Sequence, residues 1–106
     1  MAMELSELEK VIVNYLATRQ EDEILGAIRN NIDLSQEILR NVEPEMIKLI
    51  RIITMSVFRN DGLNSDTILE YISVYNPKIV KIIRETKEGV KWYDRQVKNV
   101  KRMFGL

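Results

Sequence analysis

Apolar residues recur at helical spacing along most of the chain, and no run alternates apolar and polar positions as a half-buried strand would. Near the N-terminus the apolar residues lie three and four apart, which predicts an amphipathic helix over Ser6–Thr18. Ser6 is followed three residues later by Glu9, a capping-box pattern that marks the start of this helix. We expect an all-α fold of five or six helices.

Two longer helical patterns follow. Over Asp22–Arg40 the apolar residues share one half of a helical wheel, but the Asn pair at 30–31 favours a break, because asparagine competes for backbone hydrogen bonds. A restart would be capped by Asp33 or Ser35. Over Pro44–Arg59 nearly the whole circumference is apolar, so this helix should be central in the fold or covered by a second subunit. We place it at the centre.

The next segment contains two sequence signals for the start of a helix. Asn64 or Ser65 is expected to cap a helix over Asp66–Tyr75. Asn76-Pro77 then suits a helix start, because proline at the first helical position needs no amide hydrogen bond.

The last segment has the longest regular pattern, a seven-residue repeat of apolar positions kept over nearly four heptads. Gly89 would suit a helix end, but the repeat keeps its phase across it, so one helix is predicted over about 77–103, about 40 Å long. The repeat defines an apolar seam made of Ile79, Ile83, Thr86, Val90, Tyr93, Val97, Val100 and Phe104.

The seam must be covered, either by the first helices of the same chain or by a second copy. The chain has 106 residues, which predicts a single helical domain over residues 1–106. A helix of about 40 Å overhangs a domain of that size, whose radius of gyration should be about 13 Å. We therefore expect a homodimer that pairs along the seam.

The amino-acid composition excludes several kinds of catalytic and metal-binding site. The chain has no Cys and no His, which excludes disulfides, thiolate zinc sites and the commonest general base. No spacing indicates paired catalytic carboxylates, a glycine-rich phosphate loop or a calcium loop. We expect no enzyme activity, no cofactor and no metal. The most apolar stretch, Met46–Phe58, is too short and too charged to span a bilayer, and we expect a cytoplasmic protein without a signal peptide.

Charge is distributed unevenly along this formally neutral chain. Residues 1–77 have a net charge of −6 and residues 78–106 a net charge of +6. On the last helix a basic stripe lies opposite the seam, formed by Lys81, Arg84, Lys91, Arg95, Lys98 and Arg102. Such a stripe is typical of proteins that bind a phosphate backbone, and six contacts would give a log–log salt slope near −5. A solvated face, or one paired with the acidic half of the chain, is the alternative.

Trp92 lies beside this stripe and off the seam. An exposed tryptophan between Lys91 and Arg95 would stack on a base, whereas a tryptophan under a neighbouring helix would be part of the core. We include Trp92 in the candidate nucleic-acid-binding set. The sequence thus predicts a non-enzymatic DNA- or RNA-binding module. The alternative is an assembly subunit that binds itself or an acidic protein partner through its last helix.

Overall fold

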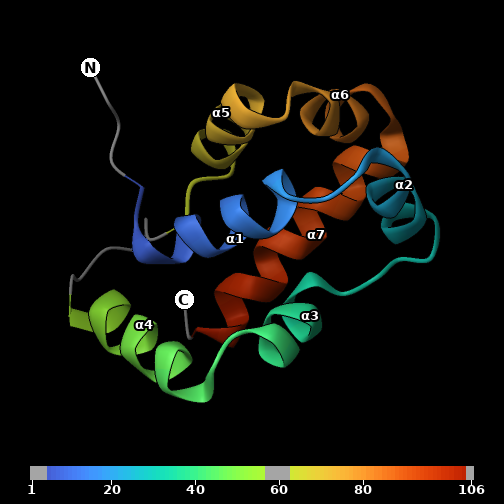
Figure 1. The fold of residues 1–106 in the computed structure, drawn as a ribbon. Helices are drawn as coiled ribbons and strands as arrows, with labels where there is room; N and C mark the ends of the chain where they lie inside the picture. Colours follow the sequence, from blue (N-terminus) through green and yellow to red (C-terminus); the bar gives the residue numbers. More distant parts are fainter. Residues whose placement is uncertain (1–4, 57–62, 105–106) are drawn as a thin grey trace.

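The computed structural model describes residues 5–56 and 63–104, with only the backbone described for residues 54–56. This part of the chain is all-helical, as expected, but it forms seven helices rather than five or six (Figure 1). One cluster of buried apolar side chains draws on every helix. The helices are α1 (Glu7–Ala17), α2 (Glu21–Arg29), α3 (Leu34–Asn41), α4 (Pro44–Ser56), α5 (Ser65–Tyr75), α6 (Pro77–Glu85) and α7 (Lys87–Met103).

The predicted capping box at the start of α1 is confirmed. The Ser6 hydroxyl accepts from the Glu9 amide at 3.2 Å, and one Glu9 carboxylate oxygen accepts from the Ser6 amide at 2.8 Å. The second carboxylate oxygen of Glu9 accepts from the backbone amide of Asn64 at 3.0 Å. Glu9 is buried, so its carboxylate joins the start of α1 to the cap of α5 through charge-assisted hydrogen bonds.

The predicted break in the second segment is also confirmed, and it separates α2 from α3. The Asp33 side chain caps α3 by accepting from the Ser35 amide at 3.0 Å, so Asp33 and not Ser35 is the cap. Asn31 has a φ of 51°, a left-handed conformation that asparagine adopts more readily than most residues.

The caps of α5 and α6 differ in chemistry. The Asn64 side chain accepts from the amides of Asp66 and Thr67, as a cap should. Asn76 precedes Pro77 as predicted, but its side chain donates to the carbonyls of Ala17 and Arg19 instead of capping α6. Asn76 therefore ties the end of α1 to the α5–α6 corner.

The prediction that the helix over Pro44–Arg59 is central is wrong. In Figure 1 α4 lies at the edge of the fold, where it packs mainly on α1. Ile47 and Ile50 are buried, whereas Leu49 and Ile52 are 50% and 64% exposed. An apolar circumference shows that a helix could be covered on every side, but it does not show that the chain has enough other helices to do so. The end predicted for this helix, at residues 57–59, lies outside the described residues.

The single helix predicted over about 77–103 is also wrong, because the chain breaks at Thr86. Thr86 is extended (φ −120°, ψ 146°), and its side chain caps α7 by accepting from the Gly89 amide at 2.9 Å. A Cβ on Gly89 would lie 2.7 Å from the carbonyl oxygens of Ile82 and Ile83, so glycine permits the close approach of α6 to α7. The heptad phase survives the break because both helices bury their apolar faces in one core.

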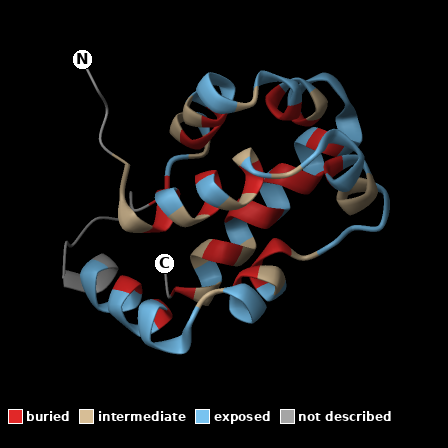
Figure 2. Cartoon of the chain, in the orientation of Figure 1, coloured by how far each residue is buried: buried red, intermediate tan, exposed pale blue. Residues whose placement is uncertain are grey.

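The central element is α7, which runs diagonally through the fold with α6, α3 and α2 packed against it (Figure 1). Because other helices cover one side of α7, buried positions alternate with exposed ones at helical spacing along it (Figure 2). Its inner face includes Trp92, Tyr93 and Val100, and its outer face is charged. The position of α7 fixes that outer face relative to the rest of the molecule.

Tyr93 predicts a loss of stability at alkaline pH. Its hydroxyl donates to the Ser65 carbonyl at 2.6 Å, and burial, reinforced by the carboxylates of Asp66 and Asp94, raises the pKa of Tyr93 well above its ordinary value. The unfolded chain therefore releases this proton at a lower pH than the folded chain, and stability should fall as pH rises above about 10. Urea unfolding at about pH 8 and about pH 11 measures the fall, which should be smaller in Tyr93→Phe. An equal fall in both proteins would show that the Tyr93 hydroxyl does not cause the loss of stability at alkaline pH.

Candidate functional site

The outer face of α7 carries a row of exposed cations, which we call the basic face: Lys87, Lys91, Arg95, Lys98 and Arg102. At 100° per residue these five positions fall within an arc of about 80°. At 1.5 Å per residue they extend over about 22 Å. Exposed Glu88 and Asp94 border the arc on its two sides. The helix therefore presents a narrow positive strip bounded by negative charge.

The cations of the basic face are almost entirely without protein partners. Arg95 donates to the side-chain oxygen of Asn31, and the other four make no hydrogen bond or ion pair within the described residues. One ion pair in that part of the chain joins the acidic and basic segments, between Lys78 and Glu21 at 3.6 Å. The acidic segment therefore does not neutralise the basic face of α7.

Lys81 and Arg84 are exposed, but the break at Thr86 places them on α6, not on the helix that carries the basic face. The stripe predicted from the sequence is thus divided between two helices. Lys91, Arg95, Lys98 and Arg102 stay together, and Lys87, which the sequence analysis did not single out, joins them. The signal that would have included Lys87 is its spacing of four residues before Lys91.

Trp92 is not available for base stacking. The side chain is buried, with 3% of the residue exposed, and its indole N–H donates to the Ile32 carbonyl at 3.0 Å. The inclusion of Trp92 among nucleic-acid-binding residues is therefore wrong in this fold. The reason is geometric: Trp92 lies on the flank of α7 that faces the α2–α3 connection, about 100° of helical rotation from Lys91.

Trp92 belongs to a set of α7 side chains that hold the α2–α3 connection. The Arg95 guanidinium donates to Asn31, and the Leu34 amide donates to the Gln96 side-chain oxygen at 2.6 Å. One turn further, the Asn99 amide donates to the Asp33 carboxylate at 3.3 Å. Four α7 positions spaced i, i+3, i+4 and i+7 thus bind four consecutive residues, 31–34. Sequence reasoning missed this contact because its partners are about 60 residues apart.

The predicted dimer seam packs within one chain. Ile79, Ile83, Tyr93, Val97, Val100 and Phe104 are buried, whereas Val90 is 42% exposed. Helices of the same chain cover these six side chains, so they are not exposed to a second copy. An uncovered seam was the reason to expect a homodimer, and these six buried positions do not form one. Self-association stays a prediction that needs a different surface.

Other kinds of site find little support in the described residues. No group of three or more Asp and Glu side chains there is placed to hold a metal ion. None of the helices described is both long enough and apolar enough to cross a membrane.

Comparisons with known proteins assign no family to this chain. No protein-family model matches the chain, and neither a curated protein nor a solved structure does so. The function must therefore be argued from the side chains alone.

Proposed function

We propose that the chain is a non-enzymatic module that binds the phosphate backbone of DNA or RNA through the basic face of α7. One observation carries the proposal: five exposed cations lie in one narrow strip, and four of them have no protein partner in the described structure. Basic residues gathered on one helical face are the electrostatic footprint of a nucleic-acid-binding protein.

The size of the strip fits a phosphate backbone. The basic face is about 22 Å long, and one strand of B-DNA carries a charge every 3.4 Å along the helix axis, so the face spans about six phosphates of one strand. The two aromatic side chains of α7, Trp92 and Tyr93, are both buried, so neither accompanies the cations at the surface of this helix. We therefore expect contacts to phosphates without base stacking, and weak dependence on sequence. A cytoplasmic setting would supply such a partner.

The solution mass with and without a short DNA or RNA duplex, at two salt concentrations, tests this function. The proposal predicts a complex at low salt that dissociates at high salt, because phosphate contacts release condensed counterions. Heparin, a polyanion without bases, should compete. No complex with either duplex at low salt would overturn the proposal.

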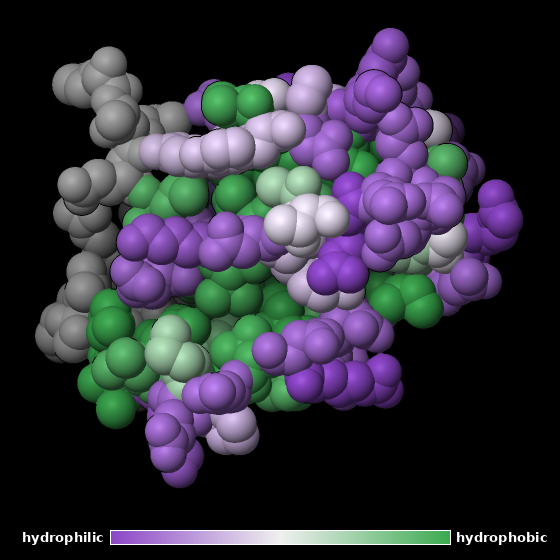
Figure 3. All heavy atoms as spheres, in the orientation of Figure 1, coloured by the Kyte–Doolittle hydropathy of each residue, from purple (hydrophilic) through white to green (hydrophobic). Residues whose placement is uncertain are grey.

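A second function, protein assembly, is favoured by the exposed apolar face of α4. Met46, Leu49 and Ile52 are 45%, 50% and 64% exposed, and they follow one another at three-residue spacing. Figure 3 shows apolar atoms at the surface where α4 lies in Figure 1. Contiguous apolar surface of this kind is typical of protein interaction sites. The form we propose is self-association through α4, in place of the buried seam.

The same mass measurement, made without a duplex, separates the two functions. Self-association through α4 predicts a dimer that Ile52→Glu converts to a monomer, because the new carboxylate would have to be desolvated in the interface. A wild-type monomer at all concentrations would contradict assembly and would leave the nucleic-acid function standing.

A further inference from the structure

A second surface feature is independent of the basic face. The ends of α1 and α3 and one side of α2 surround a cleft of about 360 Å³ whose floor includes Trp92 and Ile24. The cleft forms because these three helices pack on α4, α5, α6 or α7 more closely than on one another. Its volume lies near the lower end of the range for small-molecule sites.

Gly26 widens this cleft without serving the fold. It lies within α2, where glycine is the least favourable residue after proline. A Cβ on Gly26 would have no neighbouring atom within 4 Å, and its φ is not in the left-handed range. Neither packing nor backbone conformation therefore requires glycine at this position. The absence of a side chain at Gly26 leaves space in the wall of the cleft.

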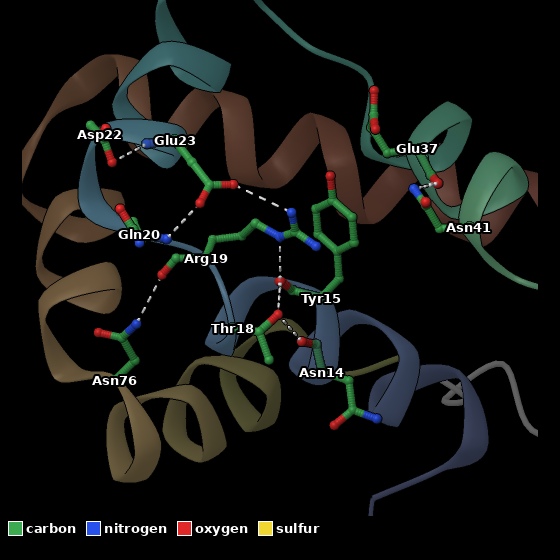
Figure 4. Close-up of polar contacts among 10 residues, drawn as sticks. All are labelled: Asn14, Tyr15, Thr18, Arg19, Gln20, Asp22, Glu23, Glu37, Asn41 and Asn76. Carbon is green, nitrogen blue, oxygen red and sulfur yellow. Dashed lines mark hydrogen bonds and ion pairs between the residues drawn. The ribbon is translucent and has the colours of Figure 1, made fainter.

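The polar groups of the cleft favour a cation. Arg19 stacks on the Tyr15 ring, 4.2 Å from its centroid, and donates to the Glu23 carboxylate at 3.3 Å, so its charge is already paired (Figure 4). Glu37 lies against the opposite side of the cleft. Within the described residues its carboxylate has one long ion pair, 3.5 Å, with the exposed Arg40. The charges that line the cleft are thus two carboxylates and one paired guanidinium.

The Tyr15 hydroxyl is a second acceptor in the cleft. It has no hydrogen-bond partner among the residues that the structure describes. The pKa of Tyr15 is raised, first by burial, and the carboxylates of Glu37 and Glu23 raise it further while Arg19 opposes them. A positive group beside this hydroxyl would find a negative potential and two oxygen acceptors, the phenol and the Glu37 carboxylate.

We propose that this cleft binds a small organic amine with a flat apolar body. The body would lie in the space beside Gly26, over the small exposed edges of Trp92 and Ile24. The ammonium group would donate to Glu37 and to the Tyr15 oxygen. An anionic ligand is disfavoured because the single arginine of the cleft is paired with Glu23 and the Glu37 carboxylate remains. The inference does not depend on the nucleic-acid function.

Three ligands with one phenyl body test the proposal: 2-phenylethylamine, 2-phenylethanol and 3-phenylpropionate. Trp92 is the only tryptophan of the chain and lies in the cleft, so its fluorescence reports binding directly. The amine is expected to change the emission saturably, the alcohol to bind about tenfold more weakly, and the carboxylate not to bind. No saturable change with the amine, or binding of the carboxylate as tightly as the amine, would overturn the proposal.

Two variants locate the site. Gly26→Leu places a side chain in the cleft and should remove amine binding while keeping the fold, since leucine favours a helix. Glu37→Gln should weaken amine binding about tenfold and leave the alcohol unchanged. Glu43→Gln, a matched change outside the cleft, should have no effect. Equal amine affinity in Glu37→Gln and Glu43→Gln would overturn the assignment of the ammonium group even if Gly26→Leu failed to fold.

Discussion

Reversing two charges on the basic face, in a Lys91→Glu/Lys98→Glu variant, is expected to lower the affinity for a nucleic-acid duplex about a hundredfold at 0.1 M salt. Both side chains are exposed and make no hydrogen bond or ion pair in the described structure, so the fold should not change. Counterion release contributes about tenfold per phosphate contact at that salt concentration, and the variant loses two contacts. Gel-shift titrations of both proteins on one duplex measure the difference.

The matched control reverses two exposed cations on other helices, Lys10→Glu/Arg29→Glu, and changes the net charge by the same amount. This variant should keep most of the affinity, because local phosphate contacts and not total charge determine binding. Thermal unfolding of both variants checks that each is folded. Equal losses in the two variants would mean that net charge alone attracts the duplex, and the basic face would not be the site.

The largest effect on stability is expected from Gly89→Ala. The new methyl group would lie 2.7 Å from the Ile82 and Ile83 carbonyl oxygens and from the Thr86 hydroxyl oxygen, all close to the corner between α6 and α7. Since two of these atoms are backbone, the helices must move apart, which should cost about 2–3 kcal/mol. For a chain of this length the midpoint of thermal unfolding should fall by roughly 10–20 °C.

Gly26→Ala is the control for that prediction. It is also a helical glycine, but its Cβ would have no neighbour within 4 Å. Alanine should therefore stabilise the protein by about 0.5–1 kcal/mol through helix propensity. Opposite signs at the two glycines are the expected result. A stabilising Gly89→Ala would show that α6 and α7 form one continuous helix, as the heptad repeat had predicted.

Local signals in the sequence were sufficient for three helix caps in which one side chain bonds to nearby backbone. The Ser6–Glu9 capping box, the Asp33 cap and the Asn64 cap all depend on partners within three residues, and all are present. The break before α3 was predictable for the same reason. Such contacts need no knowledge of which helices pack together.

The errors arose where a pattern was compatible with two packings. The apolar circumference of α4 fits a central helix and an uncovered one equally well, and the tertiary arrangement placed α7 at the centre instead. The heptad repeat fits a dimer seam and an internal face equally well. At Thr86 a single side-chain hydrogen bond ended one helix and started another without disturbing the repeat.

The candidate site was predictable in part. Charge spacing identified Lys91, Arg95, Lys98 and Arg102, because exposure follows directly from their position opposite the apolar face. Trp92 was misplaced because its partner, the Ile32 carbonyl, lies 60 positions earlier in the chain. The amine cleft left no sequence signal, since its residues come from four helices and from the α1–α2 and α2–α3 connections.

The dependence of duplex affinity on salt concentration tests the central claim most directly, because it counts the phosphate contacts. Five contacts from the basic face predict a slope of about −4.5 in a plot of log K against log salt, and Lys91→Glu/Lys98→Glu should reduce its magnitude by about 1.8. Absence of binding at low salt, or a wild-type slope shallower than about −2, would contradict a nucleic-acid interface on α7.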